Sequence, residues 1–249
     1  MWCYRQMRLF LAGTCAFPWL NNIKNSLYIL ESYFYIQDWQ IALIPYWKDF
    51  ILDSGAFTFM SGNAAGVDLV DFTYKYAEFV NKHNIKYFLE MDIDAVAPYS
   101  KVEYLRNIIE QETGRKCIPA WHRSRGKQNF IDMCKEYDYV AIGGIVSGEI
   151  KKSEFSSLRW YTAEARKLGA RVHGLGFTGR NFTEYGFFSV DSTSWLSGSK
   201  HGNITQFDGV CMKHVRRPAG FKTTHYKTVN NYVYDNWLLY QKYLDDKGE

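Results

Sequence analysis

The feature that most constrains the fold is a recurrence of short apolar runs, each ending in Gly, Asp or His and each followed by a helix-like segment. Runs of this length between polar, glycine-bearing turns are typical of strands buried on both faces, as in parallel sheets. The eight predicted strands are RLFLAG (8–13), FILDSGAF (50–57), YFLEMDID (87–94), KCIPAWH (116–122), YVAIGGI (139–145), RVHGLGFT (171–178), FFSVDST (187–193) and FDGVCM (207–212).

Between these runs, apolar residues recur at three- and four-residue spacing, which predicts amphipathic helices. The predicted helices cover 69–83, 101–113, 126–136, 153–168 and a final segment, 228–245. Strands that alternate with helices indicate an α/β protein, here a single (β/α)8 TIM-type barrel domain over residues 1–249, compact and irregular in its last third. An open doubly wound sheet is the alternative architecture.

The amino-acid composition says more about the environment of the chain than about its function. The net charge of +4 permits a polyanionic partner without requiring one. Aromatic residues make up 18% of the chain and suit either a packed core or stacking on nucleobases. The five cysteines show no CxxC or CxC spacing, so we expect reduced thiols and no cysteine-based zinc site.

No apolar stretch reaches the about 20 residues that a membrane-spanning helix needs. The run RLFLAGTCAFPWL near the start lacks a signal-peptide cleavage pattern, and we interpret it as containing the first core strand. We therefore expect a cytoplasmic protein without a membrane partner.

Polar residues and glycines gather at the carboxyl ends of the predicted strands. In a barrel these ends meet at one mouth, where barrel enzymes keep their catalytic groups. A single acid there is equally a helix N-cap or a turn residue, but acids at three strand ends favour a site. The residues at these ends are Asp53, Ser54, Asp92, Asp94, Trp121, His122, Gly143, Gly144, His173, Gly174, Gly176, Asp191 and Ser192.

Asp92 and Asp94 alternate with apolar residues and are predicted to share one face of a strand. A carboxylate there can accept hydrogen bonds from the N1–H and exocyclic amine edge of a guanine-like base. Metal binding is the competing interpretation, with His122 or His173 as further ligands. The paired glycines of AIGGIVSGE (141–149) lack phosphate-loop spacing and are predicted to let a flat ligand sit against bare amides.

The segment KHVRRPAGFKTTHYK (213–227) carries cations and no acid. Interleaved Phe221 and Tyr226 make it a candidate clamp for a nucleic-acid backbone, and a solvated loop is the alternative. The candidate phosphate-binding residues are Lys213, Arg216, Arg217, Lys222 and Lys227.

The order of these motifs resembles that of the tRNA-guanine transglycosylase superfamily. LDSGAF, MDID, IGGIVSGE, HGLGFT and GFFSVDS stand in the order of that family's DSGGFQ-like, FDE, GGLAVGE-like, GVG and GxxxFD segments, from about residue 50 to 195. The resemblance implies a TIM barrel and a pentosyltransferase that exchanges guanine for a 7-deazaguanine base within a polynucleotide.

Carried over position by position, the resemblance makes Asp191 the nucleophile and Asp53 the acid that handles the proton. Asp92 would read the base edge, and the amides of Gly143 and Gly144 would meet the base. Trp121 and His122 fall near a glutamine of the family and differ from it in residue type. The further substrate-binding residues that we expect are Ser54, Phe57, Trp121, His122 and Gly176, with Phe57 or Trp121 stacking on the base.

The chain departs from the tRNA enzymes in two ways. It lacks their cysteine and histidine zinc cluster after the last strand, and no RNA-binding domain follows. This compact, zinc-free form resembles the DNA-modifying branch found in bacteriophages and bacterial genomic islands. We therefore expect DNA as the polymer, a free 7-deazaguanine such as 7-cyano-7-deazaguanine as the incoming base, and no metal or other cofactor.

Three alternatives to this function stay open. The first is the same base exchange on tRNA. The second is a barrel glycosidase or hydrolase that acts on a small nucleoside-like substrate with Asp53 and Asp191 as its carboxylate pair. The third is a non-catalytic nucleic-acid-binding module. A homodimer is compatible with the sequence in each case.

Overall fold

The computed structural model describes residues 7–56, 66–178, 181–196, 204–215 and 226–247. Within these ranges the chain forms an α/β fold with an eight-stranded parallel sheet and a separate two-stranded antiparallel hairpin. The predicted α/β class and parallel sheet are therefore confirmed. Four predicted binding residues lie outside the described ranges, namely Phe57, Arg216, Arg217 and Lys222.

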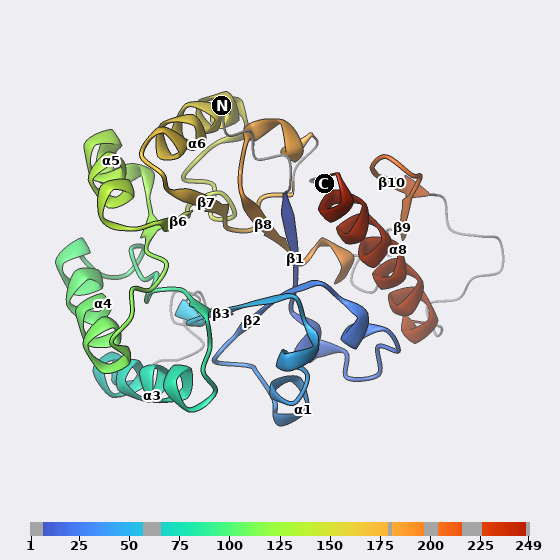
Figure 1. Cartoon of the computed structure of the whole chain (residues 1–249), viewed down its shortest axis with the longest axis horizontal. Helices are drawn as coiled ribbons and strands as arrows, with labels where there is room; N and C mark the ends of the chain where they lie inside the picture. The colour runs from blue at the N-terminus through green and yellow to red at the C-terminus, as the bar shows by residue number, and fades with distance from the viewer. Residues whose placement is uncertain (1–6, 57–65, 179–180, 197–203, 216–225, 248–249) are drawn as a thin grey trace.

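The sheet has the strand order β4-β3-β2-β1-β8-β7-β6-β5, and it curls so that its two edge strands approach each other (Figure 1). Within the described residues, β4 and β5 share no ladder and meet through one isolated parallel bridge, between Leu89 and Ile118. The sheet is thus a curled, barrel-like sheet whose ladder is not continuous around the ring. The strands are β1 (Arg8–Ala12), β2 (Tyr28–Ser32), β3 (Asp49–Asp53), β4 (Tyr87–Phe88), β5 (Ala120–Trp121), β6 (Tyr139–Ile142), β7 (Arg171–Gly174) and β8 (Ser189–Ser192).

The strand β2 is not among the predicted strands, although it pairs with both β1 and β3. An acid interrupts its apolar run YILES, which hides the strand from a search for continuous apolar segments. That acid, Glu31, is buried on the opposite face from Leu30 and accepts hydrogen bonds from the Thr14 amide at 2.7 Å and from the Thr14 hydroxyl. Burial raises the pKa of Glu31 to about 7.

The predicted strand at 207–212 is wrong. Its central residues form the turn of a hairpin between β9 (Ile204–Phe207) and β10 (Met212–Val215). The Asp208 carboxylate accepts the amide hydrogens of Val210 and Cys211, each at 2.9 Å. An Asp that bonds the backbone two and three residues onward stabilises a turn, and this local bonding outweighs the short apolar pattern.

The helices follow the predicted pattern closely. A six-residue 3-10 helix, Lys152–Ser157, precedes α6 and accounts for the early start predicted there. Figure 1 shows α3, α4, α5 and α6 outside the curled sheet on one side, and α8 with the hairpin on the other. The helices are α1 (Asp38–Ile41), α3 (Leu69–Lys82), α4 (Tyr99–Thr113), α5 (Gly126–Glu136), α6 (Leu158–Lys167) and α8 (Tyr226–Asp246).

Side chains alternate between two cores along each strand. One core fills the inside of the curl, and the other lies between the sheet and the helices. In β1, for example, Phe10 packs in the inner core while Leu9 and Leu11 pack in the outer core. This alternation follows from the two-residue period of a strand, and it directs every second strand residue toward the interior.

The last helix is tied to the first strands by a buried amide. Gln241 of α8 donates to the carbonyl oxygens of Leu9 at 2.8 Å and Tyr28 at 2.7 Å, and it accepts the Leu27 amide at 2.7 Å. These bonds satisfy the amide and fix α8 against β1 and β2. Among the helices within the described ranges, none combines the length and hydropathy that crossing a membrane requires.

Candidate active site

Acidic and imidazole side chains gather at the carboxyl ends of the parallel strands. Because neighbouring strands run in the same direction, these ends lie along one edge of the curled sheet. The structure places all of the predicted strand-end acids and histidines here. They are Asp53 at the end of β3, Asp92 and Asp94 after β4, His122 after β5, His173 in β7 and Asp191 in β8.

Asp53 is influenced by both of the other predicted acids. Burial raises the pKa of Asp53 to about 7, and the negative charges of Asp92 and Asp191 act in the same direction. The Gly55 amide, which donates to Asp53 Oδ2 at 3.1 Å, opposes this shift. Three acids that are far apart in the sequence therefore lie within electrostatic range of one another.

The turn after Asp53 depends on glycine. Gly55 has a φ of 82°, and a Cβ at this position would lie 2.7 Å from Phe34 Cβ and from Ser32 Oγ. Asp53 is therefore both the residue that caps this turn and a half-buried acid at the mouth. The neighbouring Ser54 is buried, and its hydroxyl has no hydrogen-bond partner among the residues that the structure describes.

Asp191 is held through one of its two oxygens. Its Oδ1 accepts the Gly176 amide at 2.7 Å and lies 3.2 Å from His173 Nε2. Gly176 has a φ of 65°, and a Cβ there would lie 2.3 Å from the Val146 side chain. The predicted ligand-binding Gly176 thus contacts Asp191 directly through its amide, and glycine suits both the positive φ and the close approach of Val146.

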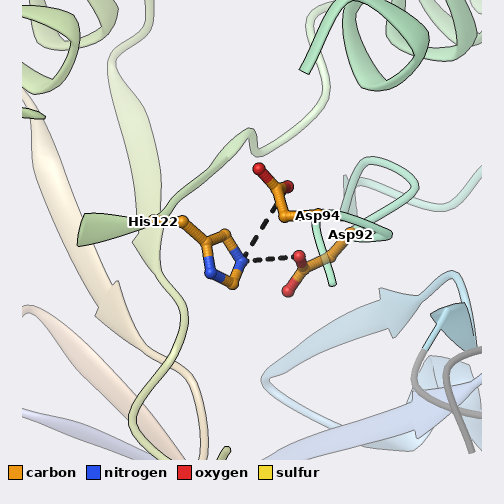
Figure 2. A group of neighbouring side chains, drawn as sticks. All are labelled: Asp92, Asp94 and His122. Atoms are coloured by element: carbon orange, nitrogen blue, oxygen red, sulfur yellow. Dashed lines mark hydrogen bonds and ion pairs between the residues drawn. The ribbon is translucent and has the colours of Figure 1, made fainter. Parts of the chain in front are cut away.

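His122 bridges two carboxylates on the other side of the mouth. Its Nε2 lies 2.7 Å from Asp92 Oδ1, its Nδ1 lies 2.7 Å from Glu149 Oε2, and Asp94 Oδ2 is 4.0 Å from Nε2. Figure 2 shows the imidazole pointing toward Asp92 and Asp94 from a separate segment of the chain. Burial alone would lower the pKa of His122, but the hydrogen bonds to Asp92 and Glu149 and the negative charges of Asp92 and Asp94 outweigh it and raise the pKa to about 9.

The paired glycines make room for this bridge. A Cβ at Gly143 would lie 2.6 Å from His122 Nε2, and a Cβ at Gly144 would lie 2.6 Å from Glu149 Oε2. The Gly143 amide donates to the Trp121 carbonyl at 2.9 Å, so it is already engaged in the sheet. The close approach expected for these glycines therefore serves side chains of the protein itself.

The negative charge of Asp94 is compensated by an arginine. Arg125 donates to Asp94 Oδ1 from Nε at 2.8 Å and to Oδ2 from Nη2, and its guanidinium lies 4.2 Å from the centre of the Tyr99 ring. Asp92, Asp94 and His122 have ligand atoms within 4.8 Å of one another, so their donor set suits a divalent cation. In this structure, however, Arg125 engages both Asp94 oxygens, and carboxylates engage both His122 nitrogens.

Trp121 lies away from the mouth. It is 1% exposed, donates its indole N–H to Gly126 O at 2.9 Å, and packs on Phe130 and Tyr161 in the outer core. Strand alternation explains this, because His122 is the next residue and takes the opposite face. The structure does not place Trp121 where it can stack on a ligand held by the acids.

Two of the predicted phosphate-binding residues lie in described segments. Lys213 in β10 is exposed and forms an ion pair with Asp208. Lys227, near the start of α8, has its Nζ 4.8 Å from the centre of the Trp19 ring. The charge of Lys213 is thus partly compensated, whereas Lys227 belongs to a cation–aromatic pair.

Sequence reasoning missed several partners of the acids. Glu149 could have been identified from the sequence, since it ends the IGGIVSGE segment that resembles a family motif. Nothing in the sequence around Arg125, apart from its charge, indicated that it would pair with an acid of the site. Tyr139 and Ser189 lie inside apolar runs and meet only through the strand order, in which β7 separates β6 from β8.

Comparisons with known proteins add little to the function. No family model matches the chain. A protein of Sulfolobus islandicus rod-shaped virus 1, described as uncharacterized protein 306, is 28% identical over 137 residues. The match covers 52% of this chain and 39% of the viral protein, whose description names no activity.

Proposed function

We propose that the chain is a transglycosylase that exchanges guanine in DNA for a 7-deazaguanine base through a covalent sugar–Asp191 intermediate. A full (β/α)8 barrel and a place in the DNA-modifying branch of the tRNA-guanine transglycosylase superfamily are parts of the same proposal. The observation that carries it is the meeting of Asp53, Asp92 and Asp191 at the strand ends, each with different partners. Such a set can divide nucleophile, proton transfer and base recognition among three acids.

The first half of the reaction breaks the bond between C1′ and N9 of guanine. A carboxylate oxygen of Asp191 attacks C1′, and the electron pair of the broken bond goes to N9 of the leaving base. Asp53 in its acid form gives a proton to that base. The raised pKa of Asp53, about 7, makes both of its protonation states available near neutral pH.

The second half restores the enzyme. The incoming 7-deazaguanine attacks C1′ through N9, the C1′–oxygen ester bond breaks, and its electron pair returns to the Asp191 carboxylate. The N9 proton passes to the Asp53 carboxylate, which regenerates the acid for the next cycle. Two displacements on one carbon retain its configuration.

Asp92 is the proposed base reader. A protonated His122 holds Asp92 Oδ1 at 2.7 Å, while the second carboxylate oxygen remains to accept N–H groups from a guanine-like edge. Glu149 fixes the imidazole from the other nitrogen at 2.7 Å. This arrangement favours a ligand with adjacent donors, as guanine and 7-cyano-7-deazaguanine both have.

DNA as the polymer is supported by the positive charge and by the basic segment 213–227. A duplex must expose the target nucleotide at a cost of a few kcal/mol (about 2 to 4), which phosphate contacts offset. tRNA is the alternative polymer, and a small nucleoside substrate is the alternative that needs no polymer.

One experiment separates these cases. The purified protein is incubated with 7-cyano-7-deazaguanine and either DNA, tRNA or free deoxyguanosine, and nucleosides are identified by mass spectrometry. We expect the modified nucleoside only in DNA, and no product with Asp191→Asn. Modified tRNA beside unmodified DNA, or turnover of the free nucleoside, would overturn the proposal.

A further inference from the structure

A chain of buried hydrogen bonds runs from Asp191 into the interior of the curled sheet. His173 Nε2 lies 3.2 Å from Asp191 Oδ1, and His173 Nδ1 lies 2.6 Å from Ser189 Oγ. Ser189 Oγ in turn lies 2.5 Å from the Tyr139 hydroxyl oxygen. His173 and Ser189 are 0% exposed and Tyr139 is 4% exposed, so water does not compete for these bonds.

The direction of these bonds follows from the groups at the inner end. Burial raises the pKa of Tyr139, so the phenol keeps its proton. Within the described ranges, Ser189 Oγ is the hydrogen-bond partner of that hydroxyl, and a buried hydroxyl left without an acceptor is costly. Tyr139 therefore donates to Ser189, and the Ser189 proton turns toward His173 Nδ1.

This direction determines the tautomer of His173. A nitrogen that accepts a hydrogen bond carries no proton, so the imidazole proton sits on Nε2 and points at Asp191 Oδ1. A proton on Nδ1 would leave either the Tyr139 hydroxyl or the Ser189 hydroxyl without an acceptor among the described residues. With a singly protonated ring, it would also set the bare Nε2 against a carboxylate oxygen.

We propose that His173 is a positioning residue that donates from Nε2 to Asp191 Oδ1 and so leaves Oδ2 as the oxygen that attacks C1′. The role of Oδ2 rests on the proposed function. The Gly176 amide occupies the same Oδ1 at 2.7 Å, and among the described residues Oδ2 has no hydrogen-bond partner. An attacking oxygen needs a free lone pair, and two donors on the other oxygen fix the carboxylate in a single orientation.

The first test measures the tautomer without any substrate. The protein is labelled with ¹⁵N-histidine, and the His173 signals are identified by their loss in His173→Gln. We expect a protonated Nε2 and an unprotonated Nδ1 in the wild-type protein. A protonated Nδ1 on His173 would overturn the proposed direction of the chain.

The second test compares two amide replacements of the imidazole. Glutamine can place an N–H near the position of Nε2, whereas the shorter asparagine reaches Ser189 and not Asp191. For base exchange on DNA we expect His173→Asn to lower kcat about 10- to 100-fold with KM unchanged, and His173→Gln to stay within about 3-fold of the wild type. Equal losses in the two variants, or a loss confined to KM, would contradict positioning.

Two further variants guard against a folding defect. Ser189→Ala removes the donor to Nδ1 and is expected to lower kcat about 3- to 10-fold while changing the tautomer signal. Tyr28→Phe removes another buried hydroxyl of the inner core, one that bonds Asp245 in α8, and should leave kcat unchanged. If the wild-type protein exchanges no base, the proposed function fails, and the tautomer measurement still decides the direction of the chain.

Discussion

Asp191 and Asp92 stand at the carboxyl ends of the same parallel sheet, in surroundings of different character. Around Asp191 the contacts come from a backbone amide and an imidazole that continues into the hydroxyls of Ser189 and Tyr139. Around Asp92 they come from an ion-paired set, in which His122 bridges Asp92 and Glu149.

The difference separates two tasks that a carboxylate can perform. A carboxylate that attacks carbon needs one oxygen held and the other free. A carboxylate that reads a base edge needs a fixed charge and orientation, which a neighbouring cation supplies. In the proposed function, the chemical step falls to the side of Asp191 and base recognition to the side of Asp92. The charges of both acids act on Asp53.

The largest effect is expected at Asp191. Asp191→Asn keeps the size of the side chain and removes the nucleophile, so base exchange should fall by about 10⁴-fold or more. The covalent adduct between protein and DNA, detected on denaturing gels, should disappear. An adduct that persists in this variant would move the nucleophile to another residue.

A surface acid provides the matched control for that loss. Asp71→Asn removes an exposed carboxylate of α3 that pairs with Lys75 and lies outside the site. We expect base exchange and adduct formation at wild-type levels in this variant.

Asp53 is expected to have the next largest effect. Asp53→Asn can neither give nor take a proton, so base exchange should fall about 10²- to 10⁴-fold. The wild-type rate should depend on pH around 7, where Asp53 titrates, and the residual rate of the variant should lack that inflection. An unchanged inflection in the variant would assign the titration to another group.

The stability of the same variant tests whether this loss is a loss of fold. A raised carboxyl pKa means that the folded state binds more protons than the unfolded state between about pH 4 and 7. The free energy of unfolding of the wild type should therefore fall as pH rises through that window. Asp53→Asn avoids this loss and should be more stable than the wild type at pH 8, as measured by urea denaturation.

The pH dependence of stability in a His122 variant tests the ion-paired side of the site, around Asp92. Its pKa in the folded protein, about 9, lies above the ordinary value of 6.5. The stabilisation from its partners is present below pH 6.5 and is lost as pH rises through about 9. His122→Gln should therefore be less stable than the wild type by roughly 2 kcal/mol at pH 6, and this difference should shrink at pH 9.5.

A difference that stays constant across that range would contradict a protonated His122 between Asp92 and Glu149. Base exchange by this variant should show a raised KM for the incoming base with a smaller change in kcat, because the recognition side is altered. A loss confined to kcat would contradict the assignment of base recognition to the Asp92 side of the mouth.

The smallest effect is expected outside both regions, at the basic residues. Lys227→Ala should lower the slope of log K for DNA binding against log salt by about 1, with a several-fold loss of affinity (about 3- to 10-fold). Lys213→Ala should change the slope less, because Asp208 already compensates the charge of Lys213. Titrations with one oligonucleotide at several salt concentrations measure both, and equal slopes in the wild type and Lys227→Ala would remove Lys227 from the DNA interface.

Much of the fold was predictable because it rests on local patterns. The three- and four-residue period of apolar side chains predicted α3, α4, α5, α6 and α8 within a few residues at most ends. The apolar runs predicted seven strands of the parallel sheet. The strand β2 was not predicted because Glu31 interrupts its apolar run. The strand predicted at 207–212 was wrong because the Asp208 carboxylate accepts hydrogen bonds from the backbone of the turn that follows it.

By itself, the sequence determined the α/β class and put acids at the ends of strands, since strand and helix periods depend on neighbouring residues alone. The tertiary structure decided which groups each acid meets. His122 and Glu149 are 27 residues apart, and Tyr139 and Ser189 are 50 apart, so only the strand order brings them within hydrogen-bonding distance. Contacts between residues far apart in the sequence leave no local pattern in it. Burial and the charges of neighbouring groups then give carboxyl groups of the same type different chemical properties.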